Sequence, residues 1–232
     1  MSKNHSLSAQ PSQKETLTGF GYLAFQLLLL PSLLTWGNSR LSHPLSDAEL
    51  NFSFYLLNFL AIILIFHSYL GRSAVQVGQH PAYFCQAVVL GLAAYYACNW
   101  AVTWIIRQLA PSFSNYNDAS IAAMSRGSYY LMLVGTVILV PPVEECLYRG
   151  LIFRNLYGKS RWAAYLVSIL AFALIHILGY VGQYSPLALL MAVLQYLPAG
   201  LCLAWAYTKA DTIFAPIVIH AAINFISIHG LR

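Results

Sequence analysis

Side chains able to do acid–base chemistry gather at three places in the C-terminal half of an otherwise apolar sequence. They are Glu144, Glu145 and Arg149; then His176; then His220 and Asn224. An ionisable side chain near the centre of a bilayer costs about 2.5–3.5 kcal/mol on insertion scales, so each glutamate, histidine and arginine here is a candidate for function, and Asn224 is included as a hydrogen-bond donor. Carboxylates and imidazoles transfer protons, and N–H donors stabilise a developing oxyanion. These residue types therefore indicate acid–base catalysis inside a membrane.

Helical spacing gives the members of these groups different roles. Glu145 and Arg149 lie four residues apart and share a helix face, with the glutamate on the N-terminal side that favours an ion pair. Glu144 points about 100° away, so it has no such partner and is free to act as a base. His220 and Asn224 also share a face, and both can donate hydrogen bonds.

The same residues could also have purely structural roles. The motifs alone do not decide between structural and catalytic roles. Glu145 and Arg149 could form a clamp at a helix end, where interfacial charges are common. His176 could be a packed histidine, while His220 and Asn224 could join two helices by hydrogen bonds. The choice depends on the elements that bring the three groups together.

Transmembrane helices must position these groups. Of 232 residues, 59% are hydrophobic and 8% are charged, whereas soluble domains carry about 25% charged residues. Apolar runs long enough to span a bilayer lie at residues 19–36, 52–70, 82–106, 128–155, 161–179, 186–208 and 213–229. The sequence therefore predicts an all-α, polytopic transmembrane bundle of about seven to eight helices that enclose a polar cavity. The eighth would arise if Pro198 breaks its run.

The spans indicate a single transmembrane domain over residues 17–232, after a polar, disordered cytoplasmic tail at residues 1–16. Lys and Arg are more numerous in the loops on the side of the tail, which favours a cytoplasmic N-terminus. We expect the cavity to open to the same side. Short loops and the absence of a targeting segment favour a multi-pass protein of a bacterial plasma membrane.

Charge and cysteine content argue against other classes. The net charge of +5 comes from basic residues scattered singly between apolar runs, so it is read as a topology signal with no nucleic-acid partner. The four cysteines show no CxxC pairing, so neither a disulfide framework nor a thiolate metal site is indicated.

Three motifs occur in a fixed order along the chain: Glu144-Glu145-x-x-x-Arg149, Phe172-x-x-x-His176 and His220-x-x-x-Asn224. This constellation resembles the CAAX prenyl protease and bacteriocin-processing family (CPBP, also called Abi) of intramembrane endopeptidases. The resemblance covers about residues 128–228, which would be the catalytic core, while residues 1–127 match only as apolar spans.

The resemblance implies roles for individual residues. Glu144 and His176 would activate a water molecule, and His220 and Asn224 would stabilise the tetrahedral oxyanion. Glu145 and Arg149 would organise the first motif. The implied partners are membrane lipid and a membrane-associated or lipidated peptide or protein, with prenylated CaaX proteins among the substrates of the family.

Zinc is an alternative to this metal-free chemistry. Two histidines and one glutamate form the His₂Glu set of some zinc peptidases, so Glu144, His176 and His220 would be the ligands if a metal is present. We favour a reaction without a cofactor, because the sequence has no H-E-x-x-H motif and Arg149 would place a positive charge close to the dication.

Two other functions compete with the peptidase. A non-proteolytic membrane scaffold or bacteriocin self-immunity protein would use the same polar residues to join helices. A transporter would use them as carriers, but the sequence shows no internal repeat. One difficulty concerns depth: straight helices over 128–155 and 161–179 place Glu144 and His176 at different depths, so a kink or a shifted helix start is required.

Overall fold

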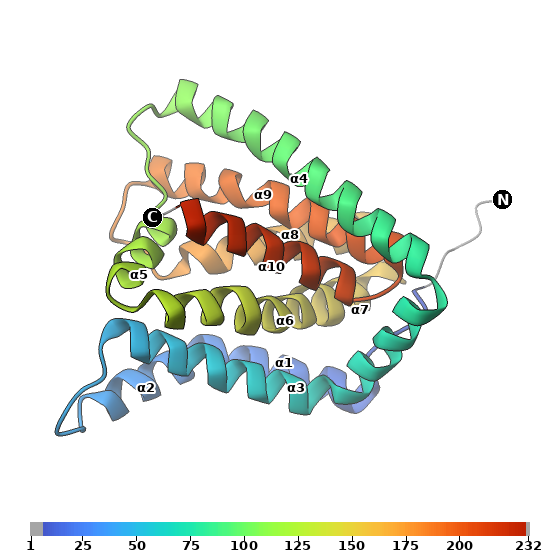
Figure 1. The fold of residues 1–232 in the computed structure, drawn as a ribbon, viewed down its shortest axis with the longest axis horizontal. Helices are drawn as coiled ribbons and strands as arrows, with labels where there is room; N and C mark the ends of the chain where they lie inside the picture. The colour runs from blue at the N-terminus through green and yellow to red at the C-terminus, as the bar shows by residue number, and fades with distance from the viewer. Residues whose placement is uncertain (1–6, 231–232) are drawn as a thin grey trace.

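Helices account for every regular element that the structure describes. The computed structural model describes residues 7–230, and no strand occurs among them. The α-helices and two π-helical segments (η) are, in order, α1 (Gln13–Leu28), α2 (Leu30–Asn38), α3 (Asp47–Gln79), α4 (Pro81–Leu109), α5 (Tyr116–Val134), η1 (Gly135–Leu139), α6 (Val140–Glu145), η2 (Cys146–Phe153), α7 (Arg154–Tyr157), α8 (Arg161–Leu178), α9 (Pro186–Ala210) and α10 (Phe214–Gly230). The predicted all-α class is confirmed (Figure 1).

Most of these helices are long and apolar enough to cross a membrane. Among the described residues, five runs qualify: α3, α4, the run from α5 through α7, α8 and α9. Helices α1 and α2 meet at a bend of 46° and together make a sixth, while α10 is apolar but only 17 residues long. The predicted multi-pass membrane fold is confirmed. Pro198 lies inside α9 without splitting it, so the eighth helix does not form.

The first described residues pack against the bundle. Leu7 is buried, and the amide and hydroxyl of Ser8 donate hydrogen bonds to the carboxylate of Asp211. Helix α1 already begins at Gln13. The prediction of a disordered tail over residues 1–16 is therefore wrong from residue 7 onward, because these contacts hold a polar segment that composition alone marks as free; the six residues before it lie outside the described part.

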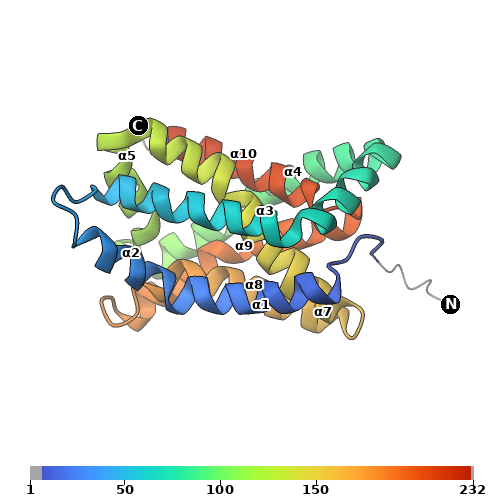
Figure 2. The same cartoon turned by 90° about the horizontal axis from the view of Figure 1, so that it is seen from below.

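The helices run along a common long direction and give the bundle two different ends (Figures 1 and 2). The α3–α4, α7–α8 and α9–α10 turns lie at the end where α1 begins, and the longer loops before α3, α5 and α9 lie at the opposite end. Most basic residues of the described chain are at or near the first end, which we call the basic end: Lys14, Arg72, Arg154, Lys159, Arg161 and Lys209.

The run from α5 to α7 is a single irregular helical rod. It kinks at Ser128, where φ is −148° and ψ is 56°. Pro141 and Pro142 have no N–H to donate, and the segment just before them widens into a π-turn in which the Val140 amide bonds the Gly135 carbonyl. Such widened turns are frequent at functional sites, and this one leads directly into the paired glutamates.

This irregular rod removes the depth difficulty. Glu144 lies about 13 residues before the end of the rod at Tyr157, and His176 lies about 15 residues after α8 begins at Arg161. At the rise of an α-helix both are roughly 20 Å from the basic end. The rod begins at Tyr116, well before the predicted start at residue 128, and bends near that residue, so the two side chains reach one level.

Gly200 marks a close helix crossing and gives a stability prediction. A Cβ added there would lie 3.2 Å from the Cα of Ile169 on α8, a backbone atom that cannot step aside. We expect Gly200→Ala to lower the free energy of unfolding by about 1–3 kcal/mol through overpacking. Gly71→Ala in α3 is the matched control, because its Cβ would meet nothing within 4 Å. Thermal unfolding of the purified variants in detergent measures both; equal melting temperatures would contradict the packing argument.

Candidate active site

The first motif is anchored by a fully buried ion pair. Arg149 donates from Nη1 to Glu145 Oε1 at 2.9 Å, and both side chains are completely buried. The guanidinium also donates to the Gly200 carbonyl at 3.2 Å and lies 4.4 Å from the ring centre of Phe172. The structure therefore contains the ion pair that the i, i+4 spacing predicts, and ties it to both α8 and α9.

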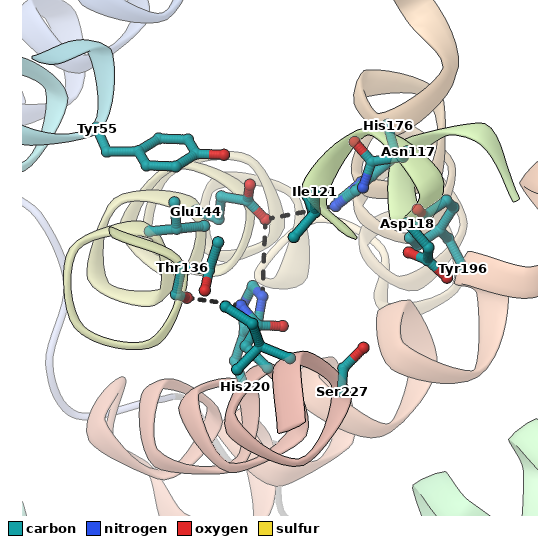
Figure 3. Close-up of a pocket in the computed structure, with 13 residues that line it drawn as sticks. Tyr55, Asn117, Asp118, Ile121, Thr136, Glu144, His176, Tyr196, His220 and Ser227 are labelled. Atoms are coloured by element: carbon teal, nitrogen blue, oxygen red, sulfur yellow. Dashed lines mark hydrogen bonds and ion pairs between the residues drawn. The ribbon is translucent and has the colours of Figure 1, made fainter. Parts of the chain in front are cut away.

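The second carboxylate of the motif faces two histidines. Glu144 Oε2 lies 4.0 Å from His176 Nε2 and 3.9 Å from His220 Nε2 (Figure 3). These distances are too long for hydrogen bonds, and Oε2 is buried with no hydrogen-bond partner among the described residues. A buried carboxylate oxygen without a partner is costly. The gap between these three atoms is therefore where a water molecule could donate a hydrogen bond to Glu144 Oε2 and lie against the two imidazoles.

Hydrogen bonds at the far nitrogens orient both imidazoles. His176 Nδ1 lies 2.8 Å from the Phe172 carbonyl, which can only accept, so Nδ1 carries a proton and Nε2 presents its lone pair. His220 Nδ1 lies 2.8 Å from Glu145 Oε1. Because that carboxylate is paired with Arg149, it too acts as an acceptor, and the His220 Nε2 is turned toward Glu144.

Asn224 sits one helical turn after His220 but has a separate partner. Its Nδ2 donates to the Thr136 carbonyl at 2.8 Å, and Thr136 belongs to η1. The second hydrogen on Nδ2 is not used in that bond. The structure thus brings all six predicted residues to one place, and the side chains of His220 and Asn224 join α10 to the irregular rod.

A cavity of about 140 Å³ opens beside Glu144. Residues that the sequence interpretation left out also line it, and Figure 3 shows Tyr55, Asp118 and Tyr196 around the same space. The Tyr196 ring stacks on His176 with centroids 4.1 Å apart. Further cavities of about 320 and 260 Å³ share lining residues with this one, so the site is reached along more than one direction.

Tyr55 could have been found from a weak signal in the sequence. Asn51, Tyr55 and Asn58 are spaced four and three residues apart, which puts a polar stripe on one face of an otherwise apolar helix. All three line the cavity that adjoins Glu144 on the α3 side. Asp118 and Tyr196 carry no comparable pattern, because only the tertiary fold turns them inward.

The position of the cavity corrects one prediction. Its lining includes Asn117 and Asp118 at the start of α5 and Ser227 and Ile228 near the end of α10, and these segments lie at the end of the bundle opposite the basic end. The expectation that the cavity opens on the side of the N-terminal tail is therefore wrong. The reason is that the rod begins about three turns earlier than hydropathy indicates, which places its first, polar turns at the mouth.

The three candidate donors fit a bridging water better than a zinc ion. A zinc ion about 2.1 Å from Glu144 Oε2 and from either histidine Nε2 would need an angle of about 140° at the metal, far from tetrahedral. A water at about 2.8 Å from the same atoms would subtend about 90°. As placed, Glu144, His176 and His220 do not fit tetrahedral zinc. Among the described residues, no group of three or more His, Cys, Asp or Glu could hold a metal ion.

Fold and site together define a polytopic membrane protein with a Glu–His centre inside the bundle. Residues 126–226 match the family model described as type II CAAX prenyl endopeptidase Rce1-like. The UPF0177 protein YxdF of Lactococcus lactis subsp. lactis (strain IL1403) is 30% identical over 87 residues, which cover 38% of this chain and 42% of that protein. No solved structure matches the chain.

The segment that builds the site, residues 126–226, is therefore similar to the Rce1-like family of type II CAAX prenyl endopeptidases, and the family resemblance carried by the three motifs is confirmed. This similarity to a peptidase family supports peptidase chemistry at the site. The chain spans less than half the length of the curated relative that it matches.

Proposed function

We propose that this protein is an intramembrane endopeptidase that hydrolyses a peptide bond with a water molecule held between Glu144, His176 and His220. The observation that carries the proposal is the buried, partnerless Oε2 of Glu144 facing two imidazole Nε2 atoms at 3.9 and 4.0 Å. A general base must lie within hydrogen-bond reach of the proton it removes, directly or through one water.

In the proposed reaction the water oxygen attacks the scissile carbonyl carbon while its proton passes to Glu144, with the His176 Nε2 lone pair orienting the water. The oxyanion accepts hydrogen bonds from His220 Nε2 and from the second Nδ2 hydrogen of Asn224. Because His220 Nδ1 faces Glu145 Oε1, His220 must carry a proton on each ring nitrogen to donate to the oxyanion from Nε2. The C–N bond then breaks, and the proton on Glu144 is transferred to the leaving amine.

The substrate we propose is a membrane-associated peptide or protein, with prenylated CaaX-type chains as one class. Support comes from the family description of residues 126–226 and from a cavity that lies among helices long enough to cross a bilayer. Such a substrate would reach Glu144 without leaving the membrane surface.

The peptidase is expected to work without zinc. Purified protein in liposomes, incubated with a panel of lipidated and unlipidated membrane peptides, should cleave at the same rate before and after dialysis against a zinc chelator. The donor spacing around Glu144 supports this expectation. Loss of cleavage on chelation with recovery on adding Zn²⁺ would instead place a metal at Glu144, His176 and His220. Cleavage of no peptide at all would favour a non-proteolytic scaffold or self-immunity protein.

We further propose that the N-terminus is cytoplasmic, because the basic end carries most of the Lys and Arg residues that the structure describes, and such residues favour the cytoplasmic side. The cavity then opens toward the opposite face of the membrane. In cells, a membrane-impermeant maleimide should label Ser114→Cys, in the loop before α5, but not Lys159→Cys in the α7–α8 turn. Exposed Cys85 and Cys98 are first replaced by alanine. The reverse labelling pattern would invert the proposed orientation.

A further inference from the structure

An apolar groove runs along the outer surface of the bundle, away from the cavity beside Glu144. It is formed by α4, α8 and α9 and encloses about 970 Å³. Ala93, Ala94 and Ala97 on α4 are small and exposed, so they form its hollow wall, and Leu166 and Leu201 face it from α8 and α9. In a membrane, a groove with this lining is filled by hydrocarbon.

At the basic end the groove continues into a second cavity of different chemistry. Trp205 lines both cavities, and the second, of about 560 Å³, is also lined by His80, Tyr83, Arg161 and Lys209. An apolar slot in the membrane thus leads to a polar, cationic chamber at the level where helices α4 and α8 begin and α9 ends.

The cations of this chamber are not neutralised within the described chain. Arg161 and Lys209 are exposed and form no ion pair with a described carboxylate; instead the Arg161 Cζ lies 5.4 Å from the Tyr157 ring centre and the Lys209 Nζ 5.6 Å from that of Tyr83. The one carboxylate that lines the chamber, Asp211, accepts two hydrogen bonds from Ser8. The chamber therefore presents positive charge to any occupant.

The start of α4 borders the same chamber, which His80 and Tyr83 line. Its N-cap, His80, makes no side-chain capping bond, and Pro81 at the first position has no N–H. The amides of Ala82 and Tyr83 in the first turn have no carbonyl within the helix to bond. Free amides at a helix N-terminus favour an anion, which reinforces the two side-chain cations.

We propose that this composite site binds one anionic phospholipid, with the phosphate at Arg161 and Lys209 and an acyl chain in the groove. Basic pockets between transmembrane helices at the membrane surface recognise anionic headgroups. Along α9, the distance from Leu201 to Lys209 is about 12 Å. This distance suits a lipid acyl chain that begins at the headgroup and descends into the membrane. A zwitterionic lipid fits less well, because the cation of its headgroup would face the positive charges of Arg161 and Lys209. The site is independent of the proposed peptidase activity.

Native mass spectrometry of the purified full-length protein tests the proposal with two lipids of identical acyl chains, dioleoyl-phosphatidylglycerol and dioleoyl-phosphatidylcholine. We expect the phosphatidylglycerol to be retained roughly thirtyfold more, since each of the two basic residues near the membrane surface contributes about 1 kcal/mol. Arg161→Gln/Lys209→Gln should reduce its retention to the phosphatidylcholine level. The matched control, Arg107→Gln/Arg126→Gln, changes two exposed arginines that line neither cavity and should retain the preference.

Two further variants separate charge from fold. Arg161→Lys/Lys209→Arg keeps both charges and should retain the preference, while Ala94→Trp fills the exposed groove and should reduce the retention of both lipids. Equal retention of the two lipids by the wild type, or an unchanged preference in the glutamine double variant, would overturn the proposal. So would displacement of phosphatidylglycerol by equimolar glycerol 3-phosphate, because the groove would then contribute nothing. A dimer with no bound lipid would assign the groove to a second copy of the chain.

Discussion

Glu144→Gln is expected to reduce the rate of peptide cleavage, measured as kcat/KM, by about 10²- to 10⁴-fold, the range that general-base catalysis contributes. The substitution keeps the size of the side chain and removes only its ability to take a proton from the water between His176 and His220. Oε2 of Glu144 has no hydrogen-bond partner among the described residues, so its charge does not stabilise the fold. Removing that charge should therefore cost no stability. The melting temperature of the variant is therefore expected to match or exceed that of the wild type.

A matched control for this prediction is Glu49→Gln. Glu49 is a surface carboxylate that caps the start of α3, and it lines none of the cavities around the site. The Glu49→Gln variant should cleave peptide at the wild-type rate. If Glu144→Gln cleaves as fast as this control, Glu144 is not the base, and the polar cluster has the structural role that its motifs left open.

Arg149→Met is expected to lower the free energy of unfolding by about 3–5 kcal/mol, the cost of leaving a buried charge without its partner. Arg149 and Glu145 are both fully buried and are joined at 2.9 Å. The double variant Glu145→Leu/Arg149→Met removes both charges and should recover most of the stability. Arg72→Met breaks a pair in which the arginine is 46% exposed, and the buried Glu15 keeps hydrogen bonds from the amides of Ser12 and Tyr69, so the cost should be smaller, about 1 kcal/mol.

Denaturant unfolding in detergent micelles measures these three variants. The order expected is wild type, then Arg72→Met, then the double variant, and last Arg149→Met. A double variant no more stable than Arg149→Met would show that the loss comes from packing against Phe172 and from the bond to Gly200 rather than from the orphaned charge. Cleavage by the double variant should be lost in any case, since His220 would lose the acceptor at Nδ1.

Hydropathy and helical spacing predicted much of this molecule because both are local properties. The membrane helices follow from the apolar runs, and the Glu145–Arg149 pair follows from residues four apart on one helix. His220 and Asn224 do share a face, yet spacing could not assign their partners. Glu145 and Thr136 lie on another helix, and which groups meet across an interface is fixed by packing.

Other features could not be read from the sequence because they depend on irregular backbone. The π-turn at Gly135–Leu139 and the bend at Ser128 break the 3.6-residue period on which the predicted depths of Glu144 and His176 rested. The bend in the rod also places Asp118 at the mouth of the cavity. A helix that starts at residue 128, as expected from hydropathy, would leave Asp118 outside the helix. The ordered course from Leu7 onward depends on contacts with residues some two hundred positions away, and no local pattern records these.

The shortness of α10 has a consequence for the bilayer around the site. Seventeen helical residues span about 25 Å, less than a hydrocarbon core of about 30 Å, and a helix shorter than the core draws the lipid inward around it. His220 and Asn224 are on this helix. Hydrophobic mismatch would then thin the membrane beside the residues that are to use water, so that the thickness of the host bilayer sets how far the hydrolytic water must travel.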